Sequence, residues 1–251
     1  AKSVIFGFEI IESKEQYHLV DFTPFLMFDR HGVAKKLRDS KQGMYKIDKS
    51  KSAVELNNTK AFPENVEFEA LLTFSGEAKG NLIRSVSPDP NNVTVIQHHS
   101  FIKLPDSKYK PRKFDPRSGA ISISFMDYST PIDELITKKY IIRHRLEKKN
   151  PELEISEAVE PIIYYLDPGT PEPVKSALLD GGKWWNQAYE SIGFKDAFQV
   201  KMLPEDADPL DCRYNVIQWV HRSTRGWSYG ASVVDPRTGE IIKGQVRGGS
   251  R

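Results

Sequence analysis

The chain has 251 residues, long enough for one large domain or two ordinary ones. Hydrophobic residues make up 39% and charged residues 28%, which excludes wholesale disorder. The 36 Lys and Arg residues exceed the 34 Asp and Glu residues by only two, so the charge gives no argument for a nucleic-acid partner. No apolar run approaches the roughly 18 residues that a membrane span needs, and the single cysteine, Cys212, excludes a disulfide within the chain.

The first 130 residues are predicted to form short strands joined by turns. Runs rich in β-branched and aromatic residues occur at 4–11, 18–22, 25–28, 66–74, 93–102 and 120–125. Turn clusters rich in Gly, Pro, Ser and Asn separate them at 75–80 and 87–92. This pattern predicts an antiparallel β domain. The Lys-rich stretch at 46–51 is interpreted as a solvated turn rather than a binding patch.

A charged stretch at 143–152 separates the two halves, and we place the domain boundary near residue 150. The predicted domains are therefore 1–150, a β-rich domain, and 151–251. The pattern at 139–146 is compatible with a strand or with a short helix.

The second half begins with a strand at 159–166 and continues into one long helix. Thr170 is the expected N-cap, Pro171 the first helical residue, and Gly193 the left-handed residue that ends the helix. Of the adjacent Trp184 and Trp185, one is expected to pack inward, because neighbours on a helix lie about 100° apart. The predicted inward face consists of Val174, Ala177, Leu178, Gly181, Trp185, Ala188 and Ile192. Gly181 and Gly182 are costly inside a helix, so a close approach to a sheet is the expected compensation.

Four more strands are predicted after the helix, at 197–203, 214–220, 230–234 and 240–242. The order strand, helix and four strands predicts a mixed sheet with one long flanking helix, and the whole chain is predicted to be α+β. An Asp-Pro-Arg-Ser/Thr-Gly turn occurs twice, at 115–119 and 235–239, and is interpreted as a structural hairpin device.

Residues able to carry chemistry are few. The chain contains no His-Glu-x-x-His or His-x-x-x-His spacing, and His98 and His99 should point to opposite faces of a strand. The acidic run at 205–211 fits either a calcium site or, as we prefer, a solvated turn. Cys212 is expected to be a buried spectator rather than a nucleophile. No catalytic residue and no metal ligand is therefore predicted within the chain.

Long segments of the second half nevertheless resemble a known family. The runs at 160–169, 184–188, 203–209, 213–220, 221–230 and 235–244 resemble the large bacterial zinc-dependent metallopeptidases of the metzincin type. The first half, including 114–119 and 128–133, resembles the β-rich domain of undefined role that precedes their catalytic domain.

The resemblance implies that residues 151–251 are the upper part of a truncated catalytic domain. In the intact parent, a zinc-activated water held by a His-Glu-x-x-His helix would hydrolyse peptide bonds. That helix is absent from the sequence, which departs from the family after Gly244. Zinc is therefore expected in the parent, with none bound to this chain, and the chain as given is expected to be inactive.

The resemblance also implies a peptide or protein substrate, bound as an extended strand along the sheet edge, and a secreted or periplasmic location. Gly230, Ala231 and Ser232 are the expected substrate-binding residues, although small residues here also suit a tight strand entrance. The alternative is a non-enzymatic module that recognises a protein or glycan partner. The sequence predicts no particular oligomeric state.

Overall fold

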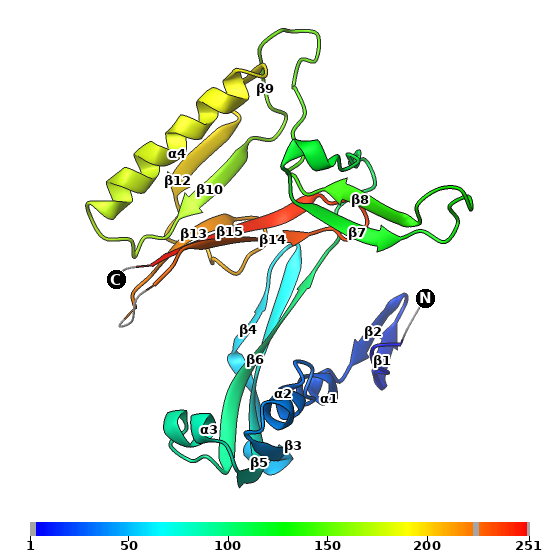
Figure 1. The fold of residues 1–251 in the computed structure, drawn as a ribbon, viewed down its shortest axis with the longest axis vertical. Helices are drawn as coiled ribbons and strands as arrows, with labels where there is room; N and C mark the ends of the chain where they lie inside the picture. The colour runs from blue at the N-terminus through cyan, green and yellow to red at the C-terminus, as the bar shows by residue number, and fades with distance from the viewer. Residues whose placement is uncertain (1–3, 223–225, 250–251) are drawn as a thin grey trace. The chain divides into compact units, whose positions relative to one another are not determined.

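A computed structural model describes residues 4–222 and 226–249 (Figure 1). The chain divides into two compact units, Ala1–Ile102 and Lys103–Arg251. In the described part of the chain, no helix is both long and apolar enough to cross a membrane. The α+β class predicted from the sequence is confirmed, with antiparallel sheets first and then a mixed sheet packed against one long helix.

The N-terminal unit is built on one long strand. Its elements are β1 (Ile10–Lys14), β2 (Tyr17–Val20), α1 (Thr23–Leu26), α2 (Val33–Asp39), β3 (Gly43–Ile47), η1 (Lys49–Lys51), β4 (Ala53–Ala61), β5 (Asn65–Ala78), α3 (Asn81–Val86) and β6 (Asn92–Ile102). Strand β5 pairs with β6 along one edge, and with β4 and then β3 along the other. All three pairings are antiparallel, as predicted.

Alternation along β5 separates a core face from a polar face. Ala70, Leu72 and Phe74 are fully buried and belong to the core of this unit. Glu67 and Glu69 alternate with them and contact His98 of β6, at 2.7 Å and 3.0 Å respectively. The two-residue period of a strand explains this separation.

Three short helices of this unit were not predicted. The strand expected at 25–28 is not formed: Phe25 and Leu26 end α1, where Pro24 occupies a first-turn position, and a turn follows. Helix α2 begins after Asp29, whose carboxylate accepts hydrogen bonds from the backbone N–H groups of Val33 (2.8 Å) and Ala34 (3.0 Å). Such short helices carry too few periods to be recognised and are stabilised mainly by packing against the sheet. The strand predicted at 4–11 begins only at Ile10.

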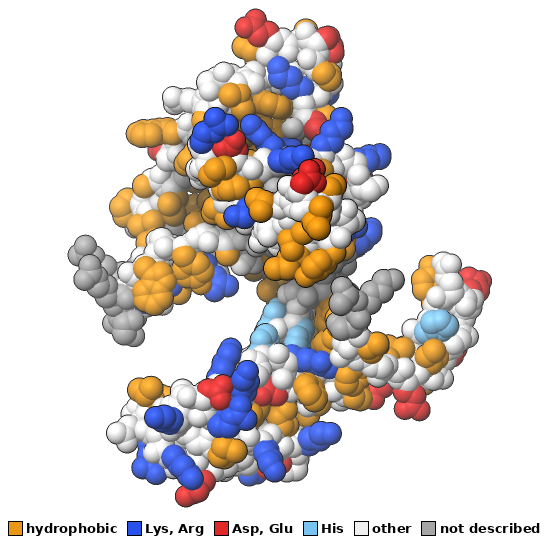
Figure 2. Space-filling view, turned by 45° about the vertical axis from the view of Figure 1, so that its right-hand side comes forward, with side chains coloured by type: hydrophobic (Ala, Val, Ile, Leu, Met, Phe, Trp, Pro, Cys, Tyr) orange, Lys and Arg blue, Asp and Glu red, His pale blue; other side chains and the backbone are white. Residues whose placement is uncertain are grey.

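The C-terminal unit contains a hairpin and a five-stranded sheet. Its elements are η2 (Pro116–Ser118), β7 (Ser122–Met126), β8 (Thr137–Ile141), β9 (Ser156–Glu157), β10 (Ile162–Leu166), α4 (Val174–Glu190), β11 (Phe194–Lys195), β12 (Phe198–Met202), β13 (Asn215–Val220), β14 (Tyr229–Val234) and β15 (Ile241–Gly249). The open alternative at 139–146 is resolved, because β8 ends at Ile141. The hairpin of β7 and β8 presents exposed hydrophobic side chains, as at Ile132 between the two strands. Figure 2 shows that hydrophobic side chains also remain on other parts of the visible surface.

The sheet order is β12-β10-β13-β15-β14. Neighbouring strands are parallel except β14, which runs antiparallel to β15 at the edge. Helix α4 lies along β12 (Figure 1). The turn at 235–239 joins β14 to β15 as predicted, with Gly239 at φ 82°. Its copy at 115–119 also ends in a left-handed glycine but precedes β7 without joining two paired strands, so the hairpin prediction is wrong there.

Helix α4 is shorter than predicted and turns a different face to the sheet. It begins at Val174 rather than Pro171, and Gly193 is left-handed as expected, with φ 84°. Trp184 and Trp185 are 74% and 64% exposed, so the prediction that one packs inward is wrong. The sheet is contacted instead by Gly182, Asn186 and Tyr189.

Candidate functional site

The residues predicted to bind substrate lie on the edge strand β14. Gly230, Ala231 and Ser232 are exposed and pair in register with Val246, Gln245 and Gly244 of β15. Within the described residues, β14 pairs with β15 alone. An unpaired strand edge presents backbone N–H and C=O groups to which an extended chain can add. The structure therefore places the three residues at an accessible edge, and their role in binding stays a prediction.

Aromatic side chains backed by arginines lie beside this edge. Arg247 donates to the Tyr229 hydroxyl at 2.9 Å and lies 5.8 Å from the centre of its ring. The guanidinium of Arg222 lies 4.8 Å from the centre of the Trp227 ring, and that tryptophan is 66% exposed. These side chains offer apolar and cationic contacts next to the open backbone edge.

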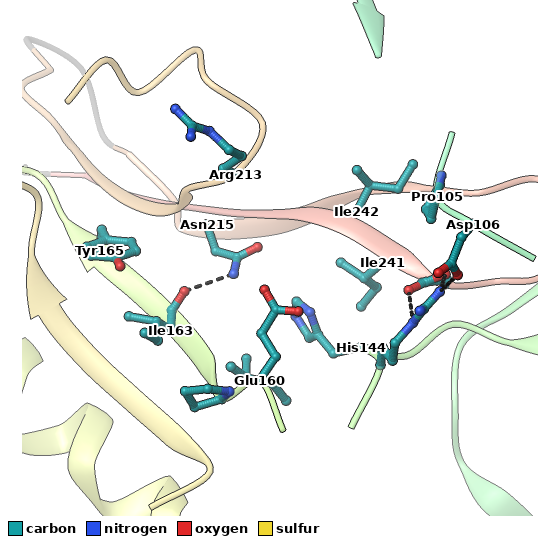
Figure 3. A pocket seen from close by; sticks show the side chains of 14 residues that line it. Pro105, Asp106, His144, Glu160, Ile163, Tyr165, Arg213, Asn215, Ile241 and Ile242 are labelled. Atoms are coloured by element: carbon teal, nitrogen blue, oxygen red, sulfur yellow. Dashed lines mark hydrogen bonds and ion pairs between the residues drawn. The ribbon is translucent and has the colours of Figure 1, made fainter. Parts of the chain in front are cut away.

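A separate cavity of about 540 Å³ lies at the other end of the same sheet (Figure 3). It opens where β10 and β15 begin, because β13 pairs with them only from Asn215 onward. The side chain of Asn215 bridges this opening: its amide donates to the Ile163 carbonyl at 2.8 Å, and its oxygen accepts from the Gly244 N–H at 2.7 Å. None of the lining residues belongs to β14.

His144 lines this cavity as a neutral base. Burial lowers its pKa to about 4, because desolvation disfavours the imidazolium form. Its Nε2 lies 3.3 Å from the hydroxyl of Tyr164, whose pKa is raised by its own burial. No lining carboxylate forms a hydrogen bond to the imidazole among the described contacts, so the base–orienter pair of a catalytic dyad is not assembled.

Arg145 neutralises two of the acidic residues that line the cavity. Its guanidinium donates to both carboxylate oxygens of Glu240, at 2.7 Å and 3.0 Å, and to Asp106 at 2.8 Å. These contacts raise the pKa of Arg145, and the hydrogen bond from Arg145 lowers the pKa of Asp106. The network ties the segment before β7 to the start of β15, and we interpret it as structural.

The acidic run at 205–211 is not simply a solvated turn. Asp211 is 3% exposed and accepts two-pronged hydrogen bonds from Arg213, which lower the pKa of the carboxyl. Lys243 of β15 donates to the backbone carbonyls of Pro209 and Asp211, at 2.5 Å and 2.8 Å. Cys212 is 4% exposed, as expected for a buried cysteine. This loop is therefore fixed to the sheet by buried charges that its own sequence does not reveal.

The described residues do not fit a zinc or calcium site. They contain no group of three His, Cys, Asp or Glu side chains placed to hold a metal ion. His98 and His99 contact different neighbours: His98 bridges Glu67 and Glu69, whereas the ring of His99 lies 5.6 Å from that of His31. Zinc needs about four converging ligands, so no catalytic step can be derived through it here.

The fold defines an α+β protein with an antiparallel β unit followed by a mixed sheet and one flanking helix. Residues 1–149 match the family described as Domain of unknown function (DUF5117), and the chain belongs to this family. The comparisons with curated proteins and with solved structures gave no match. The family match ends beside the boundary expected near residue 150, whereas the compact units divide after Ile102, so the domain boundary stays a prediction.

Proposed function

We propose that this chain contributes the substrate-binding edge of a zinc-dependent metallopeptidase of the metzincin type. The observation that carries the proposal is the exposed antiparallel strand β14, with Gly230, Ala231 and Ser232 along its open side. A substrate peptide in extended form adds to this edge through backbone hydrogen bonds, and the small side chains leave room for it. The zinc ligands come from outside the described residues, because these contain no suitable cluster.

The cavity supports this proposal less than the edge strand does. A peptidase needs a water nucleophile activated by a metal or a base close to the scissile bond. Neutral His144 and the Arg145–Glu240 pair are already engaged with groups of the chain itself. Peptide binding is therefore assigned to β14, and the cavity has a structural role.

Hydrogen exchange on the intact chain tests the role of β14. A tight-binding linear peptide selected from a random library should slow amide exchange in β14 and leave the opposite edge strand, β12, unchanged. An analogue of the same peptide with N-methyl groups at alternate amides is the control, because it keeps its side chains but loses backbone donors. Protection elsewhere in the chain, or equal binding of the methylated analogue, would contradict strand addition.

Exposed tryptophans support a second candidate, a non-enzymatic module that recognises a protein or glycan. Trp184 and Trp185 of α4 are both largely exposed, and exposed indole rings commonly stack on sugars or anchor protein partners. A glycan array and a pull-down with the Trp184→Ala/Trp185→Ala variant distinguish the two candidates. Loss of a glycan or protein partner in this variant, with no peptide effect on β14, favours the binding module.

A further inference from the structure

The N-terminal unit contains an apolar cavity that the proposed peptidase role does not use. Its volume is about 610 Å³, within the roughly 300–1,000 Å³ typical of small-molecule sites. It lies between the end of α1, helix α2, strand β3 and strand β5. Tyr45 and Phe74, which are 5% and 0% exposed, belong to its lining together with Met27, Phe28, Ala34 and Ile47.

The lining offers few polar partners to a ligand. The Tyr45 hydroxyl already donates to the Pro90 carbonyl at 2.6 Å. Among the described residues, Asp29 is the one carboxylate that lines the cavity, and both of its oxygens accept N–H groups at the start of α2. A peptide backbone or a sugar would leave its own polar groups without partners against such a lining. The cavity therefore favours an apolar ligand body.

Positive charge surrounds this apolar lining. Lys35 of α2, Lys46 of β3 and Lys49 of η1 all line the cavity, and among the described residues none of the three makes a side-chain hydrogen bond or ion pair. Strand alternation directs Lys46 away from the face of Tyr45 and Ile47, which leaves Lys35 and Lys49 as the cations beside the apolar lining. Lys and Arg side chains are also spread over other parts of this unit (Figure 2).

We propose that this cavity binds a straight-chain carboxylate, with the alkyl chain against the accessible side chains of Phe28 and Ile47 and the carboxylate between Lys35 and Lys49. The apolar lining and the two unpaired ammonium groups together match an amphipathic anion. Either feature alone would not favour this class of ligand over others. Residues 46–51 were interpreted from the sequence as a solvated turn rather than a binding patch. Because Lys49 lines this cavity, we assign it a binding role as well.

Calorimetric titration of the intact chain with octanoate and decanoate, both below micelle formation, tests the alkyl part of the site. One saturable site is expected, and decanoate should bind roughly fifteenfold more tightly, because each buried methylene contributes about a fourfold gain. Equal affinities would mean that the chain lies outside the cavity and would overturn the proposal. So would the absence of saturable binding, or binding of an acidic peptide without binding of decanoate.

Matched lysine variants test the position of the carboxylate. Lys35→Gln/Lys49→Gln should weaken decanoate binding by about fivefold or more. The control Lys36→Gln/Lys14→Gln removes the same charge, and Lys36 lies beside Lys35 on α2 without lining the cavity. Mass spectrometry after lysine methylation should show that decanoate protects Lys35 and Lys49 but not Lys36. Equal weakening in both double variants, or protection elsewhere, would refute this site.

Discussion

At the scale of single residues, two neighbours in the C-terminal unit handle charge in opposite ways. His144 is mostly buried, its Nε2 lies 3.3 Å from the Tyr164 hydroxyl, and desolvation keeps the imidazole neutral. Arg145 stays charged because Glu240 and Asp106 accept its hydrogen bonds. Local sequence does not distinguish these outcomes, because Glu240 is 95 residues away along the chain. The difference comes entirely from tertiary contacts.

His144 should make the C-terminal unit sensitive to mild acid. Because folding lowers its pKa from 6.5 to about 4, the unfolded chain binds more protons between these two values. The stabilisation is complete above pH 6.5 and is lost progressively as the pH falls toward 4, by at most about 3 kcal/mol. Urea unfolding followed by tryptophan fluorescence reports this unit, since all four Trp residues lie beyond residue 103.

The His144→Gln variant should be less stable at pH 7 but should lose this pH dependence between 6.5 and 4. His221→Gln, which replaces an exposed imidazole in the same unit, should keep the wild-type dependence. An unchanged pH profile in His144→Gln would show that other groups dominate the acid sensitivity.

At the scale of elements, helix α4 illustrates how packing selects a face. The periodic apolar residues predicted that the side of the helix bearing Trp185 and Ile192 faces the sheet, but both side chains are more than 60% exposed. The sheet is approached at Gly182, where a Cβ atom would overlap the Val200 side chain, and at Tyr189, whose ring stacks on Phe198 at 5.6 Å. A glycine allows closer packing than a large apolar side chain, so apolar periodicity alone misplaced the contact face.

The two adjacent glycines of α4 should respond oppositely to alanine. Gly182→Ala is expected to destabilise the C-terminal unit by about 1–2 kcal/mol, because steric overlap with Val200 exceeds the gain in helix propensity. Gly181→Ala is the matched control: no atom lies within 4 Å of its added Cβ, so a gain of about 0.5–1 kcal/mol is expected. Urea midpoints from tryptophan fluorescence measure both changes. Similar shifts in the two variants would contradict the close approach of α4 to β12.

At the scale of the whole molecule, the buried ionisable side chains are distributed over both units and do not form one cluster. The polar contacts of Glu67 and His98 belong to the N-terminal unit, and the buried charges around Arg145 and Asp211 belong to the C-terminal one. Each of these groups is satisfied by partners in its own unit. The two binding sites that we propose lie apart from these groups: an edge strand in one unit and an apolar cavity in the other.

The chain is expected to hold less than one equivalent of zinc after dialysis against metal-free buffer. The described residues bring no three suitable side chains together, and a tight site needs about four converging ligands. Elemental analysis by plasma mass spectrometry, normalised to protein concentration, measures this ratio. One tightly held equivalent would reveal a site that the described residues do not form and would change the proposed division of roles.

The sequence by itself determined the α+β class, the long strands at 66–74 and 93–102, the order of strands around one helix and the left-handed glycine at 193. These features depend on local periodicity and backbone conformation, which neighbouring residues encode. Only the tertiary structure decided that Gly182 faces the sheet, that Asp211 and Glu240 are buried against arginines, and that Lys35 and Lys49 line one cavity. Those outcomes depend on contacts between residues far apart in sequence, whose burial and pairing energies no local pattern contains.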